Sequence, residues 1–476
     1  MSLRVYDTRR REKLAFTPLT PGRVGMYVCG MTVQDKPHVG HMRYAVAGDV
    51  MRRYLESKGY EVIYITNFTD IDDRIIDRAN KEGVAHQEVS ERNIEAFLRY
   101  AAVLNIKSAT HYPRATEHLP EIIALIQRLI DKGHAYAASG DVYFDVRSYP
   151  RYGELSGRNV DDMRAGVRID VGEAKRDPLD FALWKGTKPG EPSWSSPWGP
   201  GRPGWHIECS AMAMKYLGET FDFHGGGQDL VFPHHENEIA QSEAATGKPF
   251  ARYWVENGLV LLGGAKMSKS TQHFFLIEDI AQQVEPEVIR FYLQSTHYRS
   301  PIEWNEDRLK EAGIAHGRLR AALAAAERTD APAGESRDLE ALQTREPALT
   351  VLALAREFEE AMDDDFNTAR AQGHLFEMAK AINRAVDAGP PTDLDREAIV
   401  YSGEVLRASG VTIGLFWGAE VPEEDATEEV QLLARQRDEA RLQKDWKRAD
   451  ELRDRILALG YVLEDQKGGT RARRKP

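Results

Sequence analysis

The first part of the chain alternates short apolar runs with segments whose apolar positions recur at helical spacing. Residues 24 to 30 (VGMYVCG) form an apolar run that ends in glycine, and positions 43 to 58 then follow a helical period. A second run, rich in β-branched and aromatic residues, spans residues 61 to 68 (EVIYITNF) and precedes another helical stretch. This alternation is typical of an α/β fold with a parallel, doubly wound sheet.

The pattern changes twice further along the chain. Between about residues 135 and 203 the segments are short and rich in Gly, Pro and Trp, which predicts an insertion folded against the main sheet. The α/β pattern resumes with FDFHGGG and a helix from about residue 234. From about residue 305 strand-like runs disappear and Ala, Leu, Glu and Arg dominate, so we expect an all-helical C-terminal region.

These changes of pattern divide the chain into segments. Two stretches of linker composition, 329 to 336 and 418 to 427, interrupt the helical region, and amphipathic helices are expected at about 428 to 443 and 446 to 459. The predicted segments are 1–134 and 204–304 (two halves of the α/β domain), 135–203 (the insertion), 305–417 (a helical bundle) and 428–476 (a small C-terminal domain).

Composition favours a globular protein that is not exported. A chain of 476 residues with 42% hydrophobic content can bury at least one large core. The N-terminus is polar and basic, and no apolar run reaches the roughly eighteen residues that a bilayer span needs, so we expect a cytoplasmic protein without a membrane partner. The two cysteines, Cys29 and Cys209, lie far apart in sequence, which excludes a secreted disulfide framework and leaves both thiols for chemistry.

Charge is unevenly distributed. The formal net charge of -12 disfavours a nucleic-acid partner, because binding a polyanion requires Lys and Arg. The last ten residues nevertheless contain five basic side chains and no acid: Lys467, Arg471, Arg473, Arg474 and Lys475. A solvated tail is the simpler interpretation of such a short basic run, and an RNA contact is the alternative.

The densest group of possible metal ligands is the segment FPHHENE. Its His234 and Glu238 are four residues apart and share one face if the segment is helical, whereas His235 points elsewhere. Zinc accepts thiolate, imidazole and carboxylate donors, and Cys29 and Cys209 supply two more. Isolated cysteines are more often small buried hydrophobes, so spacing alone only suggests a metal site.

Two short motifs are candidates for binding a nucleotide, although neither usual glycine-rich phosphate loop occurs. The tetrapeptide HVGH brings His38, Gly40 and His41 to the predicted start of the first helix, where unpaired N–H groups attract phosphate. Gly40 lacks a Cβ, so an adenine ring could stack closely there. The second motif is the later loop GGAKMSKS, which contributes Lys266, Ser268 and Lys269. Each motif alone is also compatible with an ordinary loop, and the order of the two motifs along the chain is the specific signal.

Together these motifs resemble those of the class I aminoacyl-tRNA synthetases. HVGH is similar to the HIGH motif of that class, and residues 266 to 270 to its KMSKS motif. Within the class the sequence is most similar to the cysteinyl-tRNA synthetases, and the similarity covers essentially the whole chain. The matching segments, in family order, are MYVCGMTVQD, NFTDIDDRII, GRPGWHIECSAMA, FDFHGGGQDLVFPHHENEIAQS, HYRS and AMDDDFNTARA.

The resemblance implies a fold, an activity and a set of site residues. The fold would be a Rossmann-like catalytic domain with a connective insertion, a DALR-like helical bundle and an anticodon-binding C-terminal domain. The partners would be tRNA(Cys), ATP and L-cysteine, with one Zn²⁺ per chain, Mg²⁺ accompanying ATP, and a monomeric enzyme. The implied zinc ligands are Cys29, Cys209, His234 and Glu238; the implied cysteine pocket is Trp205, His224 and Asp229; the implied catalytic residues are His38, His41, Lys266 and Lys269.

The implied reaction has two steps. The cysteine carboxylate attacks the ATP α-phosphate while the motif His and Lys side chains stabilise charge on the phosphoryl oxygens. The ribose hydroxyl of the tRNA 3′ adenosine then attacks the activated carbonyl. A zinc–thiolate contact would separate cysteine from serine, so no editing domain is required.

The chain departs from the family pattern at several positions, and three other functions compete with this interpretation. The departures bear on loop geometry and ATP affinity rather than on the class of reaction, and they occur at Gln34, Met42, residues 271 to 273 and Ala472. The competing functions are an amino-sugar ligase with the same zinc and nucleotide motifs, a zinc-stabilised RNA-binding protein without catalysis, and a zinc hydrolase. A site filled by four protein ligands disfavours the hydrolase, because it leaves no open position for water.

Overall fold

The structure is a computed structural model that describes residues 2–159, 174–262, 265–266, 276–331, 339–417, 428–443, 445–459, 461–466 and 469–474. The chain divides into two compact units, Met1–Phe416 and Trp417–Pro476. None of the described helices is both long enough and apolar enough to cross a membrane.

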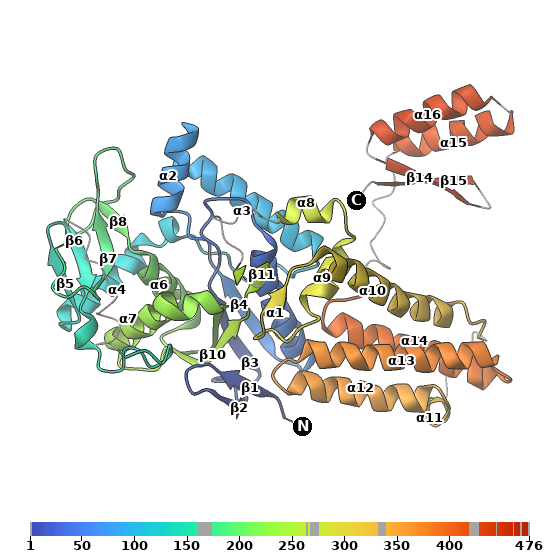
Figure 1. Cartoon of the computed structure of the whole chain (residues 1–476), viewed down its shortest axis with the longest axis horizontal. Helices are drawn as coiled ribbons and strands as arrows, with labels where there is room; N and C mark the ends of the chain where they lie inside the picture. Colours follow the sequence, from blue (N-terminus) through green and yellow to red (C-terminus); the bar gives the residue numbers. More distant parts are fainter. Residues whose placement is uncertain are drawn as a thin grey trace. The chain divides into compact units, whose positions relative to one another are not determined.

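A four-stranded parallel sheet forms the centre of the first unit (Figure 1). Its strand order is β10-β9-β3-β4, and all three strand pairs are parallel. This pairing confirms the predicted parallel sheet. The carboxyl ends of its strands meet at one edge, where open α/β sheets bind ligands. The strands are β3 (Arg23–Val28), β4 (Glu61–Thr66), β9 (Phe221–Gly227) and β10 (Ala251–Asn257).

Helices connect these strands. α1 begins at Val39, four residues before the helical period becomes visible in the sequence, because a capping box at His38 and His41 closes its first turn. The helices around the sheet are α1 (Val39–Ser57), α2 (Asp73–Glu82), α3 (His86–Val103), α4 (Leu119–Asp131), α6 (Trp205–Leu217) and α7 (Glu236–Thr246).

The predicted insertion forms an antiparallel sheet of its own with strand order β5-β6-β7-β8. In Figure 1 it lies at one end of the first unit, beside α4 and α7. A short hairpin near the N-terminus contacts β10. The insertion strands are β5 (Ala135–Ala138), β6 (Asp141–Phe144), β7 (Phe181–Gly186) and β8 (Gly201–Pro203), and the hairpin strands are β1 (Arg4–Asp7) and β2 (Glu12–Ala15).

A small three-stranded sheet follows the main sheet and has the order β12-β11-β13. β11 pairs with β12 in an antiparallel and with β13 in a parallel arrangement. The backbone of Lys266 lies in β12, and the rest of the KMSKS segment lies outside the described residues. The elements here are β11 (Val260–Leu262), β12 (Ala265–Lys266), β13 (Ile302–Glu303), α8 (Ile277–Ala281) and α9 (Pro286–Leu293).

The remainder of the first unit is helical, as predicted from residue 305 onward. Figure 1 shows α12, α13 and α14 side by side. The first of the two linkers predicted from composition overlaps residues 332–338, and the second coincides with residues around 418–427; both stretches lie outside the described residues. The helices are α10 (Glu306–Glu327), α11 (Leu339–Gln343), α12 (Ala348–Asp363), α13 (Thr368–Ala388) and α14 (Asp393–Thr412).

A buried ion pair connects the sheet domain with these helices. Asp49 of α1 and Arg290 of α9 approach to 2.5 Å, with both side chains at most 1% exposed. Arg290 also donates hydrogen bonds to the backbone oxygens of Leu104 and Ile413, and the latter directly follows α14. Burial acts to raise the pKa of Asp49, but Arg290 and Arg53 hold it below its usual value. The charge pair therefore fixes α1, α9 and the end of α14 against one another.

The second unit combines two helices with a β-hairpin, which corrects the expectation of an all-helical C-terminal region. The helices α15 and α16 lie close to the predicted ranges, but β14 and β15 pair as an antiparallel hairpin. Three of the five basic residues near the C-terminus lie in this hairpin, where Arg471 is the register partner of Glu464: Arg471, Arg473 and Arg474. Strand pairing creates β15, whose own sequence lacks an apolar run. The elements are α15 (Glu428–Leu442), α16 (Trp446–Ala458), β14 (Tyr461–Gln466) and β15 (Gly469–Arg474).

Replacing Asp49 by alanine should destabilise the first unit. The substitution leaves the Arg290 guanidinium buried without its counter-ion, which typically costs about 3 kcal/mol or more. The expected result is a lower thermal midpoint in scanning calorimetry. Lys310→Ala is the control, because Lys310 and its partner Asp307 are 73% and 86% exposed and such pairs contribute little. Equal midpoints for both variants would contradict a structural role of the buried pair.

Candidate metal centre and nucleotide site

Four separate elements bring the predicted metal ligands together. Cys29 directly follows β3, Cys209 lies on α6, His234 lies in the π-helical turn η4 (Val231–His235) and Glu238 lies in the first turn of α7. Their ligand atoms all lie within 4.8 Å of one another, and all four residues are buried. The cluster is therefore located at the carboxyl edge of the parallel sheet.

Glu238 is the residue that contacts most members of the cluster. Its Oε1 lies 3.0 Å from His234 Nε2 and accepts a hydrogen bond of 3.3 Å from the Cys29 thiol. Its Oε2 lies 2.9 Å from His224 Nε2. One carboxylate thus bridges a thiol and two imidazoles in a space without solvent.

The protonation of the cluster indicates that it can hold a cation. Burial alone would raise the pKa of the Cys209 thiol, but a hydrogen bond with Cys29 and the nearby His234 bring it to about 6. Burial would likewise lower the pKa of His234, yet Glu238 and Cys209 raise it to about 10. Burial and Cys209 raise the pKa of the Cys29 thiol well above its usual range.

At neutral pH the site therefore contains a thiolate and a carboxylate held together by the protons of His234 and Cys29. A divalent metal ion bound by two sulfurs, one nitrogen and one oxygen can replace those protons. The residues present thus fit a metal, and their donor set is of the kind that such ions accept.

The end of β4 supports the cluster through Asn67, a residue that the sequence interpretation did not single out. Its Oδ1 accepts a 2.9 Å hydrogen bond from the backbone of Gly30 and lies 3.7 Å from Cys209 Sγ. The contact is close: a Cβ added at Gly30 would lie 1.7 Å from the backbone oxygen of Asn67. The available signals were its position near the carboxyl end of the predicted strand at 61–68 and its place at the start of the family-like segment NFTDIDDRII.

Aromatic and imidazole rings surround the cluster. Trp205 stacks on His234 with ring centroids 4.4 Å apart, and His206 Nδ1 lies 3.0 Å from His234 Nδ1. His224 stacks on Trp254 at 4.3 Å. Two of the three predicted pocket residues, Trp205 and His224, therefore contact metal-ligand candidates directly. His206 and Trp254 were not predicted.

The third predicted pocket residue, Asp229, occupies a different position. It lies in the short helix η3 (Gln228–Leu230), directly after β9, and its side chain is exposed. Asp229 is thus at the rim of the site rather than in its buried part. His235, which was predicted to point away from His234 and Glu238, contacts Glu256 at 2.9 Å.

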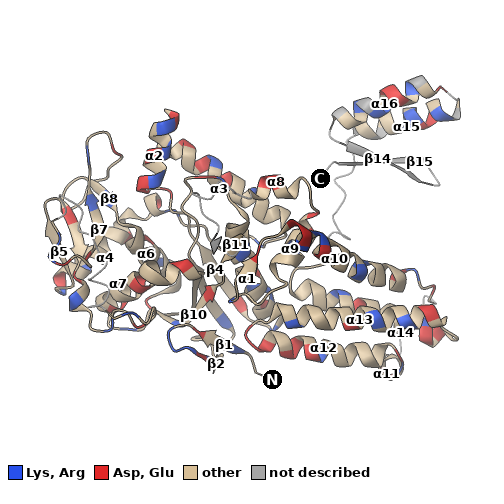
Figure 2. Cartoon of the chain, in the orientation of Figure 1, with Lys and Arg blue, Asp and Glu red and all other residues tan. Residues whose placement is uncertain are grey.

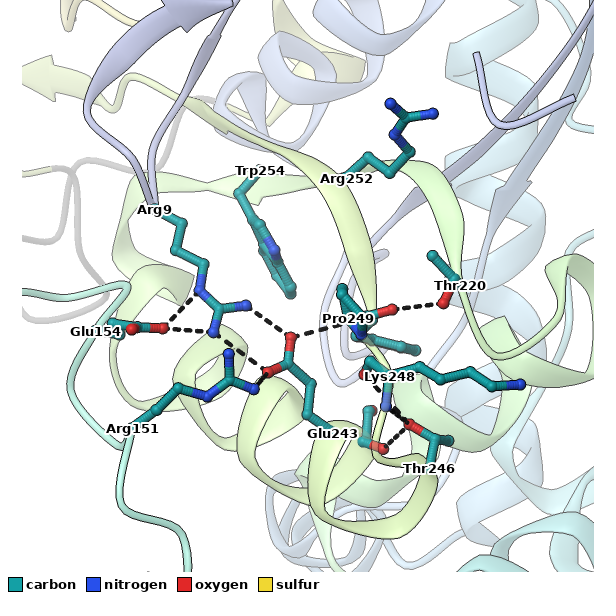
Figure 3. A network of polar contacts seen from close by, with 12 residues as sticks. Arg9, Arg151, Glu154, Thr220, Glu243, Thr246, Lys248, Pro249, Arg252 and Trp254 are labelled. Carbon is teal, nitrogen blue, oxygen red and sulfur yellow. Dashed lines mark hydrogen bonds and ion pairs between the residues drawn. The ribbon is translucent and has the colours of Figure 1, made fainter. Parts of the chain in front are cut away.

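An ion-pair network holds α7, which carries Glu238, against the insertion and the N-terminal hairpin. Figure 3 shows Arg9 and Arg151 converging on Glu243 of α7. The Arg9 Nη1 and Arg151 Nη2 atoms lie 2.6 and 2.5 Å from its carboxylate oxygens, and Tyr149 donates a third bond of 2.5 Å. Glu243 is 1% exposed, so these bonds resist solvent screening. The network fixes α7 just beyond Glu238.

The predicted nucleotide motif HVGH forms the N-terminus of α1. The His38 and His41 rings stack with centroids 3.7 Å apart. His38 Nδ1 accepts a hydrogen bond from the backbone of Gly40, and His41 Nδ1 accepts one from the backbone of His38. The motif therefore lies at a helix N-terminus, as predicted, and its two imidazoles sit against the first turn.

The chain that follows the second nucleotide motif returns to the first. Leu276 forms an antiparallel bridge with His38, and the backbone of Ile277 donates to the oxygen of Pro37. Lys36 and Glu278 form an ion pair of 2.5 Å. Of the predicted residues in the motif, Ser268 and Lys269 lie outside the described residues, as does the side chain of Lys266.

Family models match most of the chain. Residues 15–313 match the tRNA synthetases class I (C) catalytic domain, residues 357–417 the DALR domain, and residues 423–473 the cysteinyl-tRNA ligase anticodon binding domain. The protein named cysteine–tRNA ligase from Geobacter metallireducens is 51% identical over 484 residues, covering 99% of each chain. The ligase of the same name from Heliobacterium modesticaldum is 50% identical over 485 residues, again covering 99% of each.

The chain belongs to the cysteine–tRNA ligase family. Solved structures agree with the class I fold of this family. A Mycobacterium tuberculosis methionyl-tRNA synthetase in complex with methionyl-adenylate superposes with a TM-score of 0.61 at 16% identity, covering 87% of this chain and 94% of that one. A putative arginyl tRNA synthetase from Campylobacter jejuni gives 0.55 at 12% identity, covering 82% and 93%. At these identities the likeness shows the shared fold alone.

Gly30→Ala should reduce the metal content of this cysteine–tRNA ligase although Gly30 is not a ligand. The added Cβ would force the chain around Cys29 away from Asn67, because backbone rather than a flexible side chain lies in its path. Metal per chain, measured by plasma mass spectrometry after dialysis, should fall. Gly317→Ala is the control, since a Cβ there meets no atom within 4 Å and alanine suits the interior of α10. Full metal content in Gly30→Ala would show that the close contact does not position Cys29.

Proposed function

We propose that this ligase selects L-cysteine through one Zn²⁺ held by Cys29, Cys209, His234 and Glu238, and joins it to tRNA(Cys) with ATP. The buried four-donor cluster at the carboxyl edge of the sheet carries the proposal. Two sulfurs, one nitrogen and one oxygen form a donor set typical of zinc.

The choice of amino acid follows from the chemistry of sulfur. Zinc bound by these four residues would expand its coordination to a fifth ligand and accept the substrate thiol as a thiolate, a match that water and the hard, weakly acidic hydroxyl of serine do not offer. The protein's part is to keep the ligands oriented. His224 holds the second oxygen of Glu238, while Trp205 and His206 fix the ring of His234. Asp229, at the rim, suits the positively charged amino group of the substrate.

The first step requires ATP beside the cysteine site. The cysteine carboxylate attacks the α-phosphate and pyrophosphate leaves, so negative charge builds on the phosphoryl oxygens. The N-terminus of α1 supports such charge, and His38, Gly40 and His41 lie there. We assign the remaining phosphate contacts, which are made together with Mg²⁺, to the KMSKS segment: Lys266, Ser268 and Lys269.

The second step requires tRNA, and we assign recognition of its anticodon to the second unit. Residues 423–473 match an anticodon binding domain. Lys and Arg alternate with Asp and Glu along α15 and α16 (Figure 2), so local contacts rather than net charge would bind RNA. Trp446, at the start of α16, is 60% exposed and offers a surface on which a base can stack.

The domain division, location and assembly state complete the proposal. We assign catalysis to 1–134 and 204–304, the connective insertion to 135–203, a DALR-like bundle to 305–417 and anticodon binding to 428–476. One chain supplies every proposed site residue, which suits a monomer. Charging of tRNA serves translation, which suits the cytoplasm.

Cysteine-dependent ATP–pyrophosphate exchange tests the proposed function. Among the twenty amino acids, cysteine alone should support rapid exchange. Cys209→Ser should lose bound zinc and raise the KM for cysteine by more than the roughly 10- to 100-fold that removal of an outer-shell partner costs. Met212→Leu, a volume-conserving change on the same helix, is the control. Full zinc content with an unchanged KM in Cys209→Ser would overturn the assignment of the metal.

Trp446→Ala should separate charging from activation. The loss of one base–aromatic stack costs about 1–3 kcal/mol, so kcat/KM for tRNA should fall roughly tenfold while pyrophosphate exchange stays unchanged. The indole is exposed, so folding is preserved. Leu432→Ala on α15 is the control, because Leu432 is 55% exposed but has no π face. Normal charging by Trp446→Ala would remove this residue from the proposed RNA contact.

A further inference from the structure

Arg43 is a buried cation whose hydrogen bonds, within the described residues, all go to backbone carbonyls. It is the fifth residue of α1, and its side chain is among the largest that are fully buried, with the residue 1% exposed. Among the described residues its guanidinium donates to four backbone oxygens: those of Leu293 (2.6 Å), His297 (3.3 Å), Ser300 (2.8 Å) and Gly258 (3.4 Å).

Such an arrangement is unfavourable for stability alone. A buried charge that is not neutralised by an opposite charge loses its hydration, and carbonyl dipoles replace only part of it. Burial accordingly lowers the pKa of Arg43 to about 10, so the side chain stays protonated at neutral pH. An apolar side chain of similar volume would fill the same space without this cost. The forked guanidinium, however, can bind several backbone segments at once.

Three of the four carbonyls that Arg43 binds, those of Gly258, His297 and Ser300, lie on the two segments that lead into the small β12-β11-β13 sheet, and the fourth belongs to Leu293 at the end of α9. Gly258 lies two residues before β11, and its N–H donates to Tyr298 O at 2.7 Å. A Cβ at Gly258 would lie 2.3 Å from the carbonyl carbon and oxygen of Ser300, so the two backbone segments are in direct contact. Arg43 thus binds both segments where they meet.

These two segments continue into paired strands. The backbone N–H groups of Ile302 and Trp304 donate to the oxygens of Leu259 and Leu261 at 2.9 and 2.7 Å. Leu261 of β11 in turn pairs with Lys266 of β12. A displacement at the base of the sheet would therefore be transmitted through β11 to the backbone of Lys266.

The other end of the connection is the nucleotide motif of α1. Arg43 follows His41 by two residues on the same helix, whose N-terminus His38 caps. A helix interior is stiff over such a short distance because each residue is fixed by its i→i−4 hydrogen bonds. One side chain therefore links the helix that carries His38 and His41 with the sheet that carries Lys266.

We propose that Arg43 is a positioning residue for the activation step: its guanidinium fixes the β12-β11-β13 sheet, and with it Lys266, relative to the two histidines of α1. The inference rests on the proposed function, because it assigns ATP to these two motifs. Arg43 touches neither substrate nor metal ligand in this role. It acts through the backbone that it binds.

Arg290 offers a matched control within the same unit. It is as deeply buried as Arg43, it also contacts α1, through Asp49, and it also donates to backbone carbonyls. Its carbonyl partners, however, belong to residues 104, 105 and 413, and none of these lies in the β12-β11-β13 sheet. A general loosening of α1 would follow from either substitution, whereas a displaced sheet would follow from a change at Arg43 alone.

The test compares Arg43→Lys with Arg290→Lys in the full-length, zinc-loaded enzyme. Lysine keeps the charge but lacks the fork, so it cannot bind all of the carbonyls together. For Arg43→Lys, kcat/KM for ATP in pyrophosphate exchange should fall roughly 10- to 100-fold, the cost of a misplacement of about 1 Å. The KM for cysteine and the zinc content should stay within about twofold. Arg290→Lys should keep all three quantities within about twofold.

Hydrogen exchange followed by mass spectrometry gives a readout that does not depend on activity. In Arg43→Lys the amides of Gly258, Ile302 and Trp304 should exchange faster, while the strands of the parallel sheet stay protected. In Arg290→Lys these three amides should exchange as in the unsubstituted enzyme. If Arg43→Lys fails to fold, Arg43→Gln, which keeps a planar donor group, is measured in its place.

Each outcome decides the question. Unchanged ATP kinetics in a folded Arg43 variant would overturn the inference. So would equal losses in both variants with faster exchange throughout the chain, because that pattern indicates general loosening. If the unsubstituted chain shows no cysteine-dependent pyrophosphate exchange, the proposed function is overturned. If pyrophosphate exchange is normal in both the unsubstituted chain and the Arg43 variant, only the role of Arg43 is overturned.

Discussion

The structure depends on one buried carboxylate. Glu238 contacts the Cys29 thiol, His234 and His224 in a space closed to solvent. A buried anion persists only where positive or hydrogen-bonding partners surround it, so the elements that carry these partners must meet at one point. The end of β3, the first turn of α7 and the middle of β9 converge there, and the Glu243 network holds α7 in place beyond the site (Figure 3). The packing of these elements around the sheet therefore also determines where the metal centre lies.

Helix α1 links the other functional parts to this centre. Its first turn presents the two stacked histidines, Arg43 binds the base of the β12-β11-β13 sheet, and Asp49 pairs with Arg290 of α9. Successive side chains along one stiff helix therefore reach the nucleotide motif, the strand with Lys266 and the helical bundle. This arrangement explains why so many polar groups are buried at the junction of sheet and bundle: they fix orientation where apolar contacts alone would allow sliding.

Local sequence patterns predicted elements better than they predicted the contacts between them. The strands at 24–30 and 61–68 and the helices near the C-terminus were found because their periodicity is local. The hairpin of β14 and β15 was missed because the second strand, GTRARR, has no apolar alternation and exists through pairing with the first. Asn67 was missed for a similar reason. Its role comes from a backbone approach to Gly30, 37 residues earlier in the chain, which no spacing rule describes.

The sequence by itself determined which side chains can do chemistry, since two cysteines, the FPHHENE segment and the HVGH motif are present in any conformation and carry their donor atoms with them. Tertiary structure alone decided their protonation and their neighbours. Glu238 and Cys209 outweigh the effect of burial and raise the pKa of His234, and the partners of Arg43 among the described residues are backbone carbonyls. Both effects depend on distance and on exclusion of water. These quantities arise only when segments far apart in the sequence pack against one another.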